Sequence, residues 1–94
     1  MASEDLKRWH EDRLVTIVME KFPDVEKVLF APANSMGLVK KDCYYFIVKE
    51  HDSRLNDIFV PLEAELCQKY DWDVVSLPWP VEVEHERVVY EREK

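Results

Sequence analysis

Two closely spaced apolar runs constrain the fold of this chain more than any other feature. The first is residues 28–30 (VLF) and the second is residues 44–48 (YYFIV). Runs rich in β-branched and aromatic residues indicate buried strands, so we expect one strand over Val25–Ala31 and another over about Asp42–Lys49. The connector at 32–37 consists mostly of turn-forming residues and is too short for a crossover helix. The two strands are therefore predicted to pair antiparallel.

The second strand is apolar on both of its faces. Side-chain alternation divides it into two apolar sets, Cys43/Tyr45/Ile47 and Tyr44/Phe46/Val48. A strand of this kind is typical of the centre of a sheet that is covered on both sides.

Residues Ser3–Phe22 are predicted to form the first helix, with Ser3 as its N-cap and Pro23 ending it. The apolar stripe at helical spacing consists of Leu6, Trp9, Leu14, Ile17, Val18 and Phe22. We expect Trp9 and Met19 to belong to the core. His10 lies beside the stripe among charged residues, and we expect it to be solvated.

A second helix is predicted from a cap at Asp52 or Ser53 to about Tyr70. Its buried stripe would consist of Leu55, Ile58, Phe59, Leu62, Leu66 and Cys67. Pro61 falls inside this pattern, and an interior proline removes a helix hydrogen bond. We therefore expect a break or a restart near residues 59–60.

The rest of the chain predicts one short strand and an ambiguous tail. Residues 72–77 are the expected third strand, and Pro78-Trp79-Pro80 is expected to be a rigid, extended spacer. In the tail, Val81–Lys94, the valines fit both an edge strand and a helical face. We favour extended structure at Val88–Tyr90.

These elements predict one α/β (α+β) domain over residues 1–94. It would have a small mixed β-sheet and two main helices in the order α-β-β-α-β(-β). A chain of 94 residues has room for one modest core.

Composition excludes several classes of function. The net charge of −7 disfavours nucleic-acid phosphates as a partner, because binding to them depends on Lys and Arg. No apolar run approaches the length that crosses a bilayer, and the first residues do not resemble a secretory signal, so we expect a cytoplasmic protein. The single glycine, Gly37, excludes both a dinucleotide-binding turn and a phosphate-binding loop.

The two cysteines, Cys43 and Cys67, each lie in an apolar pattern. We interpret them as buried thiols that behave as small hydrophobic groups. A disulfide or a metal pair is the alternative.

The order of elements and their spacing resemble the minimal nucleotidyltransferase (MNT) domains related to DNA polymerase β. In that family a helix leads into a strand ending in Leu-Phe, followed by a Gly-Ser turn, a strand with Asp-x-Asp, a helix, and a strand with a third Asp. Residues 22–30 (FPDVEKVLF) resemble the family's first strand and its entry. Residues 62–70 and 73–75 resemble its later helix and third strand.

The chain departs from this family where the chemistry would take place. Ala31 and Pro32 stand where the Gly-Ser turn would hold phosphates, and proline has no N–H to donate. Cys43 and Tyr45 stand where two carboxylates would hold Mg²⁺, which prefers hard oxygen ligands. Only Asp73 remains of the three carboxylates. The resemblance therefore implies a degenerate nucleotidyltransferase-like domain without catalytic residues, metal or cofactor.

Two hypotheses for function follow. In the first, the chain is a protein-interaction or regulatory (antitoxin-like) module that binds a protein partner or itself. Its interface candidates are Trp79, Val88 and Tyr90. In the second, the chain is a divergent nucleotidyltransferase or a nucleotide-binding protein that uses Mg²⁺. Its candidate residues are Ser35, Asp42 and Asp73, with Asp71 as an alternative to Asp42.

Overall fold

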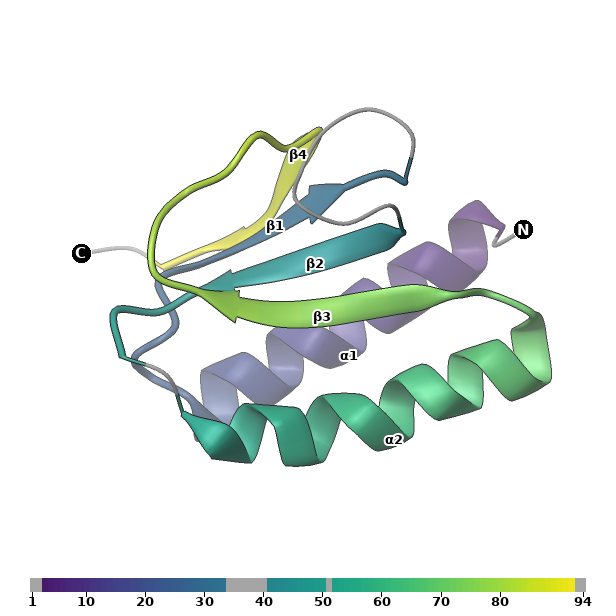
Figure 1. The fold of residues 1–94 in the computed structure, drawn as a ribbon, viewed down its shortest axis with the longest axis horizontal. Coiled ribbons are helices and arrows are strands. Elements are labelled where there is room, and N and C mark those ends of the chain that lie inside the picture. The colour runs from purple at the N-terminus through teal and green to yellow at the C-terminus, as the bar shows by residue number, and fades with distance from the viewer. Residues whose placement is uncertain (1–2, 34–40, 51, 93–94) are drawn as a thin grey trace.

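Two helices cover one face of a four-stranded mixed sheet in the computed structural model, which describes residues 3–33, 41–50 and 52–92 (Figure 1). The elements are α1 (Glu4–Lys21), β1 (Lys27–Ala31), β2 (Asp42–Ile47), α2 (Ser53–Tyr70), β3 (Val74–Trp79) and β4 (Arg87–Glu91). The predicted α+β class and element order are therefore confirmed. The fourth strand includes the extended stretch expected in the tail.

The strands lie in the order β3-β2-β1-β4, so the two apolar runs of the sequence form the centre of the sheet. Strands β1 and β2 are antiparallel as predicted, with Lys27 opposite Ile47 and Ala31 opposite Cys43. Strand β3 is parallel to β2, and α2 forms the connection that a parallel pair requires. Strand β4 is antiparallel to β1, with a shift in register between Val28 and Leu29.

The sheet separates two apolar clusters, as the two-faced pattern of β2 predicted. On the helix side, side chains of β1 and β2 pack against both helices; the buried members include Leu14, Val18, Val28, Phe30, Tyr44, Phe46, Leu55, Phe59 and Leu66. The opposite face carries Leu29, Ala31, Cys43, Tyr45 and Ile47. Burial of both faces makes β1 and β2 the most protected part of the sheet.

The segment between β3 and β4, residues 80–86, carries the chain from one edge of the sheet to the other (Figure 1). We call it the crossover. Val83 packs against the apolar cluster on the face opposite the helices, which we call the second cluster. The Glu86 amide donates a 2.8 Å hydrogen bond to the carbonyl of Phe30. The crossover therefore lies against the face of the sheet that the helices leave free.

The ends of both helices follow the predicted signals. The Ser3 hydroxyl accepts a 3.1 Å hydrogen bond from the Leu6 amide, and the Asp52 carboxylate accepts one of 3.0 Å from the Arg54 amide. Helix α2 ends at Tyr70, and its C-cap residue Asp71 has a φ of 53° in the left-handed region. Neither of the described helices is long and apolar enough to span a membrane.

The buried face of α1 is rotated from the predicted one. His10 and Glu11 are buried together with Leu14 and Val18, whereas Trp9 is 44% exposed. The expectations of a core Trp9 and Met19 and of a solvated His10 are therefore wrong. His10 and Glu11 replace part of the apolar stripe, and Glu11 is bonded to Tyr44 and Arg87 on other elements, which a hydrophobic pattern cannot reveal.

The predicted break at Pro61 is also wrong, because α2 continues through this residue. Both Pro61 and Asp57, four residues earlier, are exposed. The Asp57 carbonyl, which would accept the missing N–H, lies on the exposed side of the helix, where water can satisfy it. The helix therefore tolerates the proline without ending.

Two further expectations require correction. Strand β3 runs to Trp79, so Pro78 and Trp79 belong to the strand and not to a spacer. This proline is tolerated because β3 lies at an edge, where a missing N–H breaks no pairing. Cys67 is exposed, not buried, whereas Cys43 is buried as predicted and both are free thiols.

Candidate functional site

Asp42, a candidate nucleotide ligand, has a structural role at the start of β2. One carboxylate oxygen accepts a 3.0 Å hydrogen bond from the Ala33 amide, and the other accepts one of 2.9 Å from Nε1 of Trp72. The side chain thus joins the end of β1 to the entry into β3. Its contact with Trp72 also shows that it faces the helices, opposite to Cys43, as side-chain alternation predicted.

Asp73 lies at the same end of the sheet, next to the pairing of Asp42 with Val74. Its carboxylate is largely exposed and lies 3.2 Å from Nζ of Lys41. Asp71 is the left-handed C-cap residue of α2, and its amide bonds to the Cys67 carbonyl. Ser35 lies outside the described residues. The structure therefore brings Asp42 and Asp73 to one end of the sheet, with each carboxylate already engaged.

Cys43 and Tyr45 lie side by side on the face opposite the helices, and both are fully buried. Burial raises the pKa of the Cys43 thiol to about 12, although a hydrogen bond with Tyr45 acts in the opposite direction. A thiol that remains protonated is neither a nucleophile nor a metal ligand at neutral pH. Within residues 3–33, 41–50 and 52–92, no group of three or more His, Cys, Asp or Glu side chains is arranged to hold a metal ion.

A partly buried ionic network, which the sequence did not reveal, joins α1, β2 and β4. The Tyr44 hydroxyl donates a 2.6 Å hydrogen bond to Oε2 of Glu11. Arg87 donates to both oxygens of the same carboxylate, with 2.6 Å between Nη1 and Oε1. Burial, followed by the hydrogen bond to Glu11, raises the pKa of Tyr44, and the bond to Glu11 raises that of Arg87. The network attaches the last strand to the first helix.

His10 lies next to this network and is fully buried. Its ring packs edge-on against Tyr44 and Trp72, with 5.5 Å between ring centroids in each case. Nδ1 lies 3.1 Å from Nη2 of Arg13, whereas Nε2 has no hydrogen-bond partner. Burial and the nearby Arg13 charge lower the pKa of His10 to about 4. The imidazole is therefore neutral and forms part of the packing at neutral pH.

The interface candidates are placed differently from one another. Trp79 is partly buried and packs against the second apolar cluster, so it covers the chain's own sheet. Tyr90 is also partly buried and packs on the helix side. Val88 is 45% exposed on β4. Of the three, only Val88 offers a largely accessible apolar side chain.

The β3 edge of the sheet is partly blocked by the chain itself. Because the Trp79 carbonyl accepts from the Val48 amide, alternation directs residues 74, 76 and 78 outward. The outward amide of Ser76 donates to the Glu63 carboxylate from α2, and Pro78 has no amide hydrogen. Burial raises the pKa of Glu63, while this backbone hydrogen bond lowers it.

The β4 edge differs from the β3 edge in being open. Strand β4 is the last in the sheet order and, among the described residues, pairs with β1 alone. Exposed Val88 lies on the crossover side of this strand, opposite Leu29, whereas Val89 and Tyr90 pack toward the helices. Main-chain groups and apolar side chains are therefore both present at an edge with one free side.

An open depression of about 480 Å³ lies at the end of the sheet opposite Asp42 and Asp73. It is lined by Pro23, Asp24, Glu26, Lys49, Glu50 and Arg92. Arg92 is held there by hydrogen bonds from its guanidinium to the carbonyls of Val25 and Phe22. The lining mixes both signs of charge, and neither Asp42 nor Asp73 is among its residues.

The fold and this geometry define a small α+β protein with an open sheet edge. No protein-family model, no curated protein and no solved structure matches the chain.

Proposed function

We propose that this chain is a non-catalytic protein-interaction or regulatory module, antitoxin-like in its mode of action, that binds a protein partner through the β4 edge. The observation that carries the proposal is the asymmetry between the two edges of the sheet. Glu63 and Pro78 block two of the three outward amide positions of β3, whereas β4 pairs with β1 alone among the described residues and carries exposed Val88. Exposed strand edges pair readily with other chains, and proteins usually block those that are not used.

The alternative is a divergent nucleotidyltransferase or nucleotide-binding protein, as the MNT-like element order suggested. Its candidate ligands would have to leave their present contacts. Asp42 would lose its bonds to Ala33 and Trp72, and Asp73 its pairing with Lys41. The exposed Asp73–Lys41 pair would cost little to break. Binding of Mg²⁺ by Asp42 would be opposed by the loss of its two hydrogen bonds, which favours the interaction proposal.

Thermal denaturation with Mg²⁺ and each of the four nucleoside triphosphates distinguishes the two functions. A ligand that binds only the folded state raises the melting temperature. The interaction proposal predicts no shift with any nucleotide. A reproducible rise that is lost in Asp73→Asn, and retained in the exposed-site control Asp57→Asn, would contradict it.

A further inference from the structure

We propose that the β4 edge binds an extended segment of another protein in which basic residues alternate with β-branched or other apolar residues. This inference rests on the proposed function and names the chemistry of the partner. Strand addition supplies main-chain hydrogen bonds for affinity, while the side chains on each face supply specificity.

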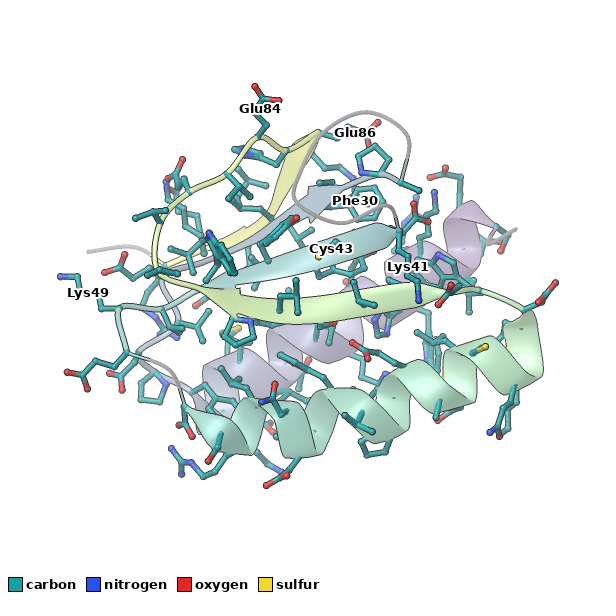
Figure 2. All side chains as sticks on the ribbon, in the orientation of Figure 1. Phe30, Lys41, Cys43, Lys49, Glu84 and Glu86 are labelled. Carbon is teal, nitrogen blue, oxygen red and sulfur yellow. The ribbon has the colours of Figure 1, made fainter. Side chains whose placement is uncertain are left out.

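The charges around β4 favour a basic partner. Residues 82–92 carry four glutamates and two arginines. Lys27 pairs with Glu82 and Glu91, and Arg87 pairs with Glu11. Glu84 and Glu86 have no ion-pair partner among the described residues, and Figure 2 shows Glu84 projecting away from the crossover. The charge of Glu86 also acts on Arg87, which is already bound to Glu11. The two carboxylates that form no ion pair among the described residues would therefore attract Lys or Arg of a partner.

The two faces of β4 differ, and this predicts an alternating partner. Arg87 faces the helices, so alternation places Glu86 and Val88 on the crossover side. Val89 and Tyr90 pack on the helix side. An added strand would thus meet the Glu86 carboxylate beside Val88 on the crossover side. On the helix side it would meet Val89 and Tyr90 beside an Arg87 whose charge is already bound to Glu11. A sequence that alternates basic and apolar residues matches both faces.

A second copy of this chain fits the edge less well. Each copy carries a net charge of −7 and would bring its own Glu84 and Glu86 to the contact. The register shift opposite Val28 and Leu29 also makes the edge irregular. Irregular edges disfavour long sheet-to-sheet pairing, whereas a short peptide can follow them.

Fluorescence anisotropy with three labelled heptapeptides tests the inference on the full chain. The first alternates Lys and Val, the second alternates Glu and Val, and the third is the Lys–Val peptide with its central valine N-methylated. We expect the Lys–Val peptide to bind and the Glu–Val peptide not to bind. N-methylation should weaken binding by about tenfold, the loss expected for one interstrand hydrogen bond.

Variants of the chain test whether the Lys–Val peptide binds at β4. Val88→Lys should weaken binding of the Lys–Val peptide, because it adds a positive charge to the face of β4 that would meet the peptide's lysines. Glu84→Gln with Glu86→Gln should weaken it and reduce its salt dependence. Val60→Lys is the matched control, since Val60 is exposed on α2, and it should bind like the unmodified chain. Circular dichroism verifies that each variant is folded.

The possible outcomes separate the inference from the proposed function. Absence of Lys–Val binding at millimolar peptide, or equal binding of the N-methylated or Glu–Val peptide, overturns the inference. The inference is also overturned if light scattering shows a dimer that Val88→Lys dissociates. That result would still agree with the proposed function as an interaction module. Nucleotide stabilisation together with absence of peptide binding and of self-association overturns both.

Discussion

The hydroxyl of Tyr44 on β2 donates a 2.6 Å hydrogen bond to Oε2 of Glu11 on α1 in the interior of the protein. The same carboxylate receives Arg87 from β4, so a single glutamate connects three elements. The Glu11 side chain is only 11% exposed, whereas that of Arg87 is 42% exposed. Removal of a partner of such a buried carboxylate is destabilising, because its charge stays desolvated.

Replacement of Tyr44 by phenylalanine should lower the free energy of unfolding by about 1–3 kcal/mol, because the variant removes the hydroxyl and leaves Glu11 under-bonded. Urea denaturation measures this value. Tyr70→Phe is the matched control, since Tyr70 is exposed, and it should change stability little. Equal stability of the two variants would show that the Tyr44 hydroxyl contributes nothing to the network.

His10 should make the protein sensitive to mild acid. Its pKa is about 4 in the folded state and 6.5 for the free side chain. Since the folded value is the lower one, the unfolded state takes up the proton first. The stabilisation is complete above pH 6.5 and is lost as the pH falls toward 4, to a total of about 3 kcal/mol.

Urea denaturation between pH 7 and pH 5 measures this loss, and His10→Phe should reduce its slope with pH. The variant His85→Phe is the control, because His85 is only partly buried on the crossover. The assignment to His10 would be wrong if both variants kept the slope of the unmodified chain.

The two cysteines should differ sharply in reactivity. Cys67 is exposed, whereas Cys43 is buried and its pKa is raised to about 12 by burial. A thiol reagent such as DTNB at pH 8 should therefore modify Cys67 rapidly in the native protein and Cys43 only after unfolding in urea. Native Cys67→Ser should show no rapid phase. A rapid phase in that variant would mean that the crossover side of the sheet opens readily.

Replacement of Pro61 by alanine should stabilise the protein. The new amide can donate to the Asp57 carbonyl within an already continuous helix. We expect a gain of about 1–3 kcal/mol, reduced by the greater freedom of the unfolded chain. Thermal and urea denaturation measure it, with Val60→Ala at the neighbouring exposed site as the control. A loss of stability would indicate that α2 is kinked by the proline and packs in that form.

Local patterns were sufficient to predict the central strands, the caps and the element order. The alternation of Cys43 to Val48 predicted a strand with two buried faces, and Ser3 and Asp52 predicted where the helices begin. Each of these signals depends on neighbouring residues only. They describe the backbone well but reveal little about long-range polar contacts.

The features that the sequence did not predict depend on contacts between residues that are distant in the sequence. Glu11 and Arg87 are 76 residues apart, and nothing in the local pattern around His10 indicates that they meet beside it. The prediction of a spacer at Pro78 was wrong because a proline is tolerated in an edge strand. The edge position of β3 follows from the strand order of the whole sheet and cannot be seen in the local sequence. The sequence offered Asp42 and Asp73 as candidate nucleotide ligands but could not show that Trp72 and Lys41 already contact them.

The crossover has a consequence for the order in which the sheet assembles. Strand β4 can join β1 only after the chain has returned across the whole sheet, so it forms the most non-local pairing in the protein. Such a strand is expected to detach first in partial unfolding, and its amides should exchange with deuterium sooner than those of β2. A partner strand on β4 would bury its free side and slow that exchange. Deuterium exchange of the β4 amides would therefore be a sensitive measure of whether a partner strand is bound at this edge.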